Sequence, residues 1–267
     1  MEIFLIIIFG FIFGSFISMA SYRLGTRGSK ITDLIIRRSF CQKCNNILKI
    51  KNLIPIFSWI FQGGKCSHCK NKIPPRYILI EIFTTIFFLI SYFVLGQNFN
   101  VHLFIILAII VILMIASIVD LEHYFIPNIT QISLLILAIC YHIFITKNYN
   151  IQNHILSAFL YALIIYSIFY IFLIIRKKYA IGSDDLKFFP IAGIFLGMNN
   201  FVYFIAFLGI FGIIYGVAWK FFKKEDTFPF APALSFALIM NLWGFADLFD
   251  ISDILECMIF ECLYESY

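Results

Sequence analysis

Long apolar runs alternate with short polar turns along most of the chain, which is the pattern of membrane-spanning helices. A helix needs about 20 mostly apolar residues to cross the hydrocarbon core of a bilayer. Runs of this kind occur at residues 3–22, 77–96, 101–119, 129–146, 155–175, 201–222 and 228–248. Another run, 186–198, is shorter than the bilayer is thick, so we expect it to be tilted, kinked or joined to its neighbour. The pattern predicts an all-α polytopic membrane protein with about eight transmembrane helices.

The composition supports this fold class and limits the kinds of molecule that we expect the protein to contact. Of the 267 residues 62% are hydrophobic and 13% are charged, whereas a soluble domain is about 45–50% apolar. The net charge of +5 arises from basic residues placed in loops between apolar runs, so we expect membrane lipid and no nucleic acid as a partner. The first run has no basic residue before it, unlike a secretory signal peptide, and we interpret it as a retained transmembrane helix.

Charge placement predicts the orientation in the membrane. The loop from Arg23 to Arg76 holds twelve of the 20 Lys and Arg residues, and short loops rich in these residues stay in the cytoplasm. With eight alternating spans, the basic turns at 176–187 and 220–224 also fall inside, and Lys147 is the only basic residue outside. The segment from Asp247 to Tyr267 is acidic and lacks Lys and Arg, as expected of an external tail.

These patterns divide the chain into four parts. We expect a first transmembrane helix at 1–22, a cytoplasmic basic loop at 23–76, a transmembrane core at 77–248 and an acidic external tail at 249–267.

The basic loop contains two CxxC pairs separated by 21 residues, close to the spacing of a zinc ribbon. The four candidate zinc ligands are Cys41, Cys44, Cys66 and Cys69. Metal binding would supply much of the folding free energy of a loop with so little core. Two disulfides or four free thiols are the alternatives, and the predicted cytoplasmic location weakens the disulfide version. Within the second pair His68 is a possible substitute ligand, Cys140 is expected to pack in an apolar run, and Cys257 and Cys262 could pair with each other.

Two aspartates are the first candidates for chemistry. Asp120 follows the apolar run 101–119, and Asp185 lies in the short polar segment 182–187, GSDDLK. Carboxylates near lipid are costly and usually face a site, and the predicted orientation puts both at cytoplasmic helix ends. Two carboxylates a few ångströms apart cannot both ionise, so one would polarise a scissile carbonyl while the other activates water, as in a peptide hydrolase. The plain alternative is that each acid caps a helix or pairs with a nearby Lys.

The neighbouring acids are given supporting roles. We expect Glu122 and Asp184 to form local hydrogen bonds or to be solvated. Glu81 lies inside the second span, where a carboxylate must be paired or protonated, and Arg76 could be its partner.

Taken together, the motifs resemble those of the bacterial type IV prepilin peptidases, membrane aspartic proteases of the GxGD type. The segment 14–24, GSFISMASYRL, resembles the family signature GSFxNxxxxRL, and the two CxxC pairs followed by PRYILIE at 75–81 resemble its loop and RYxLxE motif. DLE at 120–122 with IPN at 126–128, GSDDLK at 182–187 and FPFAP at 228–232 resemble the two catalytic blocks and the late PFxP turn. The resemblance covers nearly the whole chain.

The resemblance implies an inner-membrane leader peptidase whose substrates are prepilins or pseudopilins of pilus or secretion systems, with the catalytic face cytoplasmic. It implies that Asp120 and Asp185 are the catalytic pair, and Asp185 is preferred over Asp184 because it lies two residues before Lys187. It also implies zinc in the loop and N-methylation of the new terminus with S-adenosylmethionine. The chain departs from the family pattern at three positions, with Ser18 in place of Asn, and Asp184 and Ala231 each in place of Gly.

Two other functions are compatible with acids in a membrane protein. A transporter would use the carboxylates for proton or cation coupling, with acids near mid-membrane and no need of a cysteine loop. A non-catalytic assembly factor for a pilus or secretion system would use the cysteine loop to bind a partner.

Overall fold

The regular structure of the chain is helical, as the apolar runs predict. The computed structural model describes residues 1–26, 38–146, 151–177, 182–224 and 227–245, where every regular element is a helix apart from two isolated β-bridges. Six of these helices are long and apolar enough to cross a membrane. They are α1 (Glu2–Gly25), α4 (Arg76–Val94), α5 (Val101–His123), α6 (Asn128–Tyr141) with its π-helical continuation η2 (His142–Thr146), α7 (Ile151–Arg176) and α10 (Phe201–Lys223).

The two remaining predicted spans are short helices. The run 186–198 becomes α8 (Ser183–Leu186) and α9 (Phe188–Leu196), and Gly197 ends α9 with a φ of 69° that favours glycine. The run 228–248 contains α11 (Ala231–Leu242), which begins after Pro229 and has Pro232 in its first turn, where proline is tolerated. Its 12 residues span about 18 Å, less than the roughly 30 Å thickness of the hydrocarbon core.

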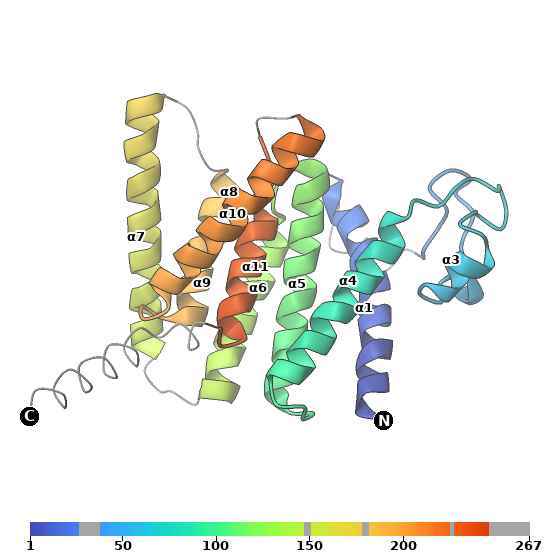
Figure 1. Ribbon diagram of the computed structural model, residues 1–267, viewed down its shortest axis with the longest axis horizontal. Coiled ribbons are helices and arrows are strands. Elements are labelled where there is room, and N and C mark those ends of the chain that lie inside the picture. The colour runs from blue at the N-terminus through green and yellow to red at the C-terminus, as the bar shows by residue number, and fades with distance from the viewer. Residues whose placement is uncertain (27–37, 147–150, 178–181, 225–226, 246–267) are drawn as a thin grey trace, which may run out of the picture.

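Helix α5 is the central helix of the bundle. It packs against α1, α4, α6 and α11, and Figure 1 shows it in the middle of the molecule. Its side chains Leu103, Ile109, Ile110 and Leu113 are fully buried. By contrast, α7 and α10 expose most of their apolar side chains, as helices that face lipid do.

Helices α1 and α4 are in close contact because glycines line their crossing. A Cβ atom on Gly10 would lie 2.6 Å from the Cα of Thr85, and one on Gly14 would lie 2.5 Å from the Cα of Glu81. The spacing of four residues is the small-xxx-small pattern that lets membrane helices approach closely. This contact fixes the face of α4 that carries Glu81 against α1.

The polar connections gather at one end of the bundle. Figure 1 shows that the end of α5, helix α8, the end of α10 and the loop carrying the short helix α3 (Phe57–Phe61) lie at this end, whereas the N-terminus lies at the other. The 3-10 turn η1 (Ile50–Asn52) belongs to the same loop. The structure therefore brings the cysteine loop and both candidate aspartates to one end of the membrane bundle.

Candidate active site

Asp120 lies in the last turn of α5 and is 5% exposed. Its Oδ2 accepts a 2.8 Å hydrogen bond from the backbone N–H of Ala231, at the start of α11. The N-terminus of a helix carries partial positive charge, so the start of α11 is a favourable partner for this carboxyl. One turn earlier on α5, the hydroxyl of Ser117 donates to the Ser235 hydroxyl at 2.9 Å, which ties α5 to α11 beneath the carboxylate. The FPFAP turn thus holds Asp120 through its backbone, a contact that side-chain patterns did not predict.

Asp185 lies in α8 and is partly buried. A Cβ atom at position 182 would lie 2.9 Å from its Oδ2, so any larger residue there would displace this carboxylate. The φ of Gly182 is −66°, an ordinary value, and conformational freedom is not the reason. Gly182 therefore makes room for the carboxylate of Asp185.

The two aspartates interact electrostatically. Burial, together with the negative charges of Asp120 and Asp184, raises the pKa of Asp185 from its ordinary value of 3.8 to about 7, against a hydrogen bond from the Gly182 backbone that lowers it. When one acid of a pair stays protonated near neutral pH and the other is ionised, the first can donate a proton while the second accepts one. The structure brings together the two acids that the sequence singled out.

Asp184 is engaged by other groups. Its Oδ1 forms a 2.8 Å ion pair with Nζ of Lys187, which also donates to Oδ1 of Asn128 at 3.3 Å. Its backbone carbonyl accepts a 2.8 Å hydrogen bond from Nε2 of Gln131 on α6. These contacts fix α8 against the start of α6, and both acids of α8 interact electrostatically with Asp120.

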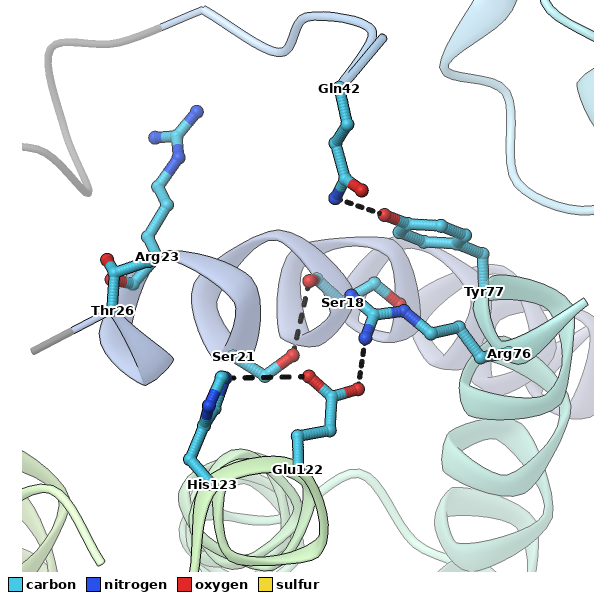
Figure 2. Close-up of polar contacts among 9 residues, drawn as sticks. All are labelled: Ser18, Ser21, Arg23, Thr26, Gln42, Arg76, Tyr77, Glu122 and His123. Carbon is cyan, nitrogen blue, oxygen red and sulfur yellow. Dashed lines mark hydrogen bonds and ion pairs between the residues drawn. The ribbon is translucent and has the colours of Figure 1, made fainter. Parts of the chain in front are cut away.

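Glu122 is part of a polar cluster beside the site. Figure 2 shows the Arg76 guanidinium from α4 paired with its carboxylate, and His123 on the other side at 4.0 Å. A Cβ atom on Gly25 would lie 2.3 Å from the His123 ring, so the end of α1 closes on the same cluster. We expected Glu122 to form local hydrogen bonds or to be solvated, and the structure shows that it forms an ion pair that joins α5 to α4.

The expected pairing of Arg76 with Glu81 is wrong. Arg76 pairs with Glu122, and Glu81 instead accepts a 2.7 Å hydrogen bond to Oε2 from the backbone N–H of Ile56 in the cysteine loop. Residues five apart do not share a helix face, and tertiary packing supplies both partners. Glu81 is 7% exposed and joins the membrane bundle to the loop.

The four candidate zinc ligands come together in the loop. One ligand atom from each of the four cysteines lies within 4.8 Å of the other three, and the Cys41 and Cys69 sulfurs are 3.9 Å apart. Each CxxC pair forms a tight backbone turn, here called a knuckle. The N–H of Asn45 donates to the Cys41 carbonyl at 2.8 Å, and the N–H of Lys70 donates to the Cys66 carbonyl at 3.0 Å. An antiparallel β-bridge closes each turn, Phe40 with Ile47 and Lys65 with Lys72.

The cluster fits a tetrahedral zinc ion. A Zn–S bond of about 2.3 Å implies sulfurs about 3.8 Å apart, close to the observed separation, whereas a disulfide needs about 2.05 Å. The backbone N–H groups of Cys69 and His68 lower the pKa of Cys66 to about 7, which favours the thiolate that binds metal. His68 is not part of the ligand cluster, and Cys140 is a free cysteine within α6. The expected pair Cys257 and Cys262 and the acidic tail lie outside the described residues.

A cavity of about 280 Å³ lies between α1, α4 and the cysteine loop. It is bordered by Ser18, at one of the three positions where the chain departs from the family pattern, and by Glu81. Ser18 is 3% exposed, and its hydroxyl has no hydrogen-bond partner among the described residues. No sequence motif indicated this cavity.

Comparison with known proteins gives two family matches in series. Residues 8–95 match the bacterial peptidase A24 N-terminal domain, and residues 105–217 match the type IV leader peptidase family. The first match contains the cysteine cluster and the second contains both Asp120 and Asp185.

Relatives from several bacteria are similar along most of their length. The type 4 prepilin-like proteins leader peptide-processing enzyme of Escherichia coli O78:H11 is 28% identical over 80% of this chain and 78% of its own. The prepilin leader peptidase/N-methyltransferases of Bacillus subtilis and Vibrio cholerae are 28% and 24% identical, over 88% and 86% of this chain and 92% and 91% of theirs. No solved structure is a significant match.

Proposed function

Because the chain belongs to the type IV leader peptidase family, we propose that it is a membrane aspartic endopeptidase that removes the leader of prepilins or pseudopilins. The observation that carries the proposal is the raised pKa of Asp185, about 7, to which burial contributes most and the negative charge of Asp120 next. The position of both acids at one end of the bundle favours a peptidase over a transporter, whose carboxylates belong near mid-membrane.

The roles of the two acids follow from their surroundings. Asp120 accepts the Ala231 N–H at a helix N-terminus and acts as the base that takes a proton from water. Asp185 holds a proton and donates it to the oxygen of the scissile carbonyl as the water oxygen bonds to the carbonyl carbon. The proton on Asp120 then passes to the leaving nitrogen as the peptide bond breaks, and a hydroxyl proton of the intermediate returns to Asp185 as the new carboxyl group forms. Asp184, paired with Lys187, orients α8 and has no part in the proton transfers.

We further propose that this end of the bundle faces the cytoplasm of a bacterium, with the protein in the inner membrane. The twelve basic residues of the 23–76 loop support this orientation through the positive-inside rule. In a reducing compartment the four cysteines would hold zinc rather than disulfides. When bound, zinc would tie the two knuckles together, and the Glu81–Ile56 hydrogen bond would then dock the loop on α1 and α4.

The names of the relatives include a second activity. We propose that this chain also methylates the amino terminus that cleavage exposes, with S-adenosylmethionine as methyl donor.

The peptidase proposal is tested by expressing the chain with a prepilin and following loss of the leader by gel mobility. We expect Asp120→Ala and Asp185→Ala each to abolish cleavage. Asp184→Ala is the matched control, because it changes the adjacent acid, which is paired with Lys187, and leaves both Asp120 and Asp185 in place. Cleavage that survives both Asp120→Ala and Asp185→Ala would refute the proposal.

A further inference from the structure

A cavity of about 520 Å³ lies between α4, α5, α10 and α11 and reaches the surroundings of Asp120. Its wall is mostly apolar. Ser117 borders it one turn before Asp120 on α5, and Pro232 borders it directly after Ala231, whose N–H holds the Asp120 carboxylate. The cavity is therefore an apolar space that adjoins one of the two candidate catalytic acids.

Tyr215 of α10 borders this cavity, and its buried hydroxyl group has no hydrogen-bond partner among the described residues. The charge of Asp120 acts on its phenol, so the ring lies near this acid. Its other side packs against Phe228 of the FPFAP turn, with ring centroids 6.0 Å apart. A buried hydroxyl group without a partner costs folding free energy, so its presence beside a cavity points to a ligand that accepts a hydrogen bond.

A second hydrogen-bond donor of the same kind lies one turn further along α10. The indole Nε1 of Trp219 is buried and has no hydrogen-bond partner in the part of the chain that the structure describes. The ring centroids of Tyr215 and Trp219 are 5.8 Å apart, and Nζ of Lys223 lies 5.6 Å from the Trp219 ring, toward the end of α10. Residues four apart share one face of a helix and are about 6 Å apart along its axis.

This spacing fits the backbone of an extended peptide. Carbonyl groups on one edge of an extended chain recur at every second residue, about 6.7 Å apart. A peptide bond inside a helix is hydrogen-bonded within that helix, so a bond that is to be cut must lie in an extended segment whose carbonyls need new donors. A lipid acyl chain has no hydrogen-bond acceptor, and it would fill the cavity while leaving both donors unpaired.

We propose that the face of α10 that carries Tyr215 and Trp219 binds the extended backbone of the substrate next to the scissile bond, while the apolar cavity receives an apolar side chain of the segment that continues into the bilayer. This inference rests on the proposed peptidase activity. The Tyr215 hydroxyl donates to the substrate carbonyl nearest Asp120. The Trp219 indole N–H donates to the carbonyl two residues away, toward the polar end of the bundle, where Figure 1 shows α10 ending. The two donors bind a backbone that every sequence has, and the cavity selects the side chain.

The test is steady-state cleavage of a purified prepilin by the full-length, zinc-loaded protein in detergent, over a range of prepilin concentrations. We expect Tyr215→Phe to raise KM about tenfold at an unchanged kcat, because the lost hydrogen bond holds the bound substrate and the transition state alike. The variant should unfold at or above the temperature of the unchanged protein, because the hydroxyl group has no partner to lose among the described residues. Tyr170→Phe is the matched control, since it removes the same group from an exposed tyrosine of α7, and it should keep KM.

The indole is tested in the same assay. Trp219→Phe should also raise KM, whereas Trp243→Phe makes the same change at an indole whose Nε1 donates to Oγ of Ser91 at 3.0 Å, and it should keep KM. An unchanged KM in Tyr215→Phe, an equal rise in Tyr170→Phe, or a lower kcat at an unchanged KM would overturn the assignment of Tyr215 to the bound peptide.

The cavity is tested by filling it. Met114 of α5 is half-buried and borders the cavity, so Met114→Trp should place a larger ring there and raise KM at least about tenfold. Leu163→Trp, on an exposed face of α7, is the control and should keep KM. An unchanged KM in Met114→Trp would assign the cavity to lipid and overturn its role in substrate binding. If the unchanged protein cuts no prepilin, the peptidase proposal itself fails, whereas cleavage with an unchanged KM in all three variants overturns this inference alone.

Discussion

Replacing Asp185 by Asn should remove part of the pH dependence of stability. The pKa of Asp185 is raised from 3.8 to about 7 by burial and by the charges of Asp120 and Asp184, so the folded state binds a proton that the unfolded state releases between these values. An acid with a raised pKa costs no stability below its unfolded pKa and costs more as the pH rises through the folded value. The unchanged protein should therefore lose stability on going from about pH 5 to about pH 8.

The size of the effect follows from the two pKa values. Linkage gives a loss of about 2.5 kcal/mol between about pH 5 and about pH 8, and partial solvent access to Asp185 reduces this to about 2 kcal/mol. Asp185→Asn cannot ionise and should lack this loss, so it should be the more stable protein at about pH 8. A residue whose removal stabilises the fold has the character of a functional group.

The assay is reversible unfolding of the purified protein in mixed detergent and SDS, followed by circular dichroism at both pH values. Asp184→Asn is the control, because it removes the ion pair with Lys187 and leaves Asp185 in place, so the pH-dependent loss should remain. Identical pH dependence in Asp185→Asn and the unchanged protein would refute the raised pKa of Asp185.

Three further changes test other parts of the structure. Gly182→Ala should lower the cleavage rate at least about tenfold, because its Cβ would lie 2.9 Å from Oδ2 of Asp185, whereas Gly209→Ala, with open space around it, should cut normally. Removing zinc with a chelator should expose the loop to trypsin while α5 and α11 stay folded, as gel analysis and circular dichroism would show; a loop equally resistant without metal would contradict a structural zinc. Gly14→Ala should lower the free energy of unfolding by about 1–3 kcal/mol relative to Gly209→Ala, because its Cβ would lie 2.5 Å from the Cα of Glu81; equal stability of the two variants would contradict the close helix contact.

The apolar pattern predicted the long helices because membrane helices must satisfy their own backbone hydrogen bonds, and length and hydropathy are then sufficient signals. It overestimated the run 228–248, where Pro229 precedes a helix of 12 residues that has Pro232 in its first turn. The cysteine cluster was also predictable, since each CxxC pair is a local turn and the pairs need only meet.

Contacts between distant segments were not predictable. The pairing of Arg76 was assigned to Glu81 by proximity in sequence, whereas the structure pairs it with Glu122, 46 residues away. The Ala231 N–H that holds Asp120 is a backbone group and leaves no residue type to recognise. The Ser18 hydroxyl, which has no hydrogen-bond partner among the described residues, and the cavity that it borders become visible only in the folded structure.

The most direct test of the aspartate pair is the intact mass of a pilin produced together with the unchanged protein, Asp120→Asn, Asp185→Asn or Asp184→Asn. We predict that the pilin lacks its leader with the unchanged protein and with Asp184→Asn, and keeps the full leader with Asp120→Asn and with Asp185→Asn. A leaderless pilin produced with Asp120→Asn or Asp185→Asn would contradict the assignment of these two carboxylates to peptide cleavage.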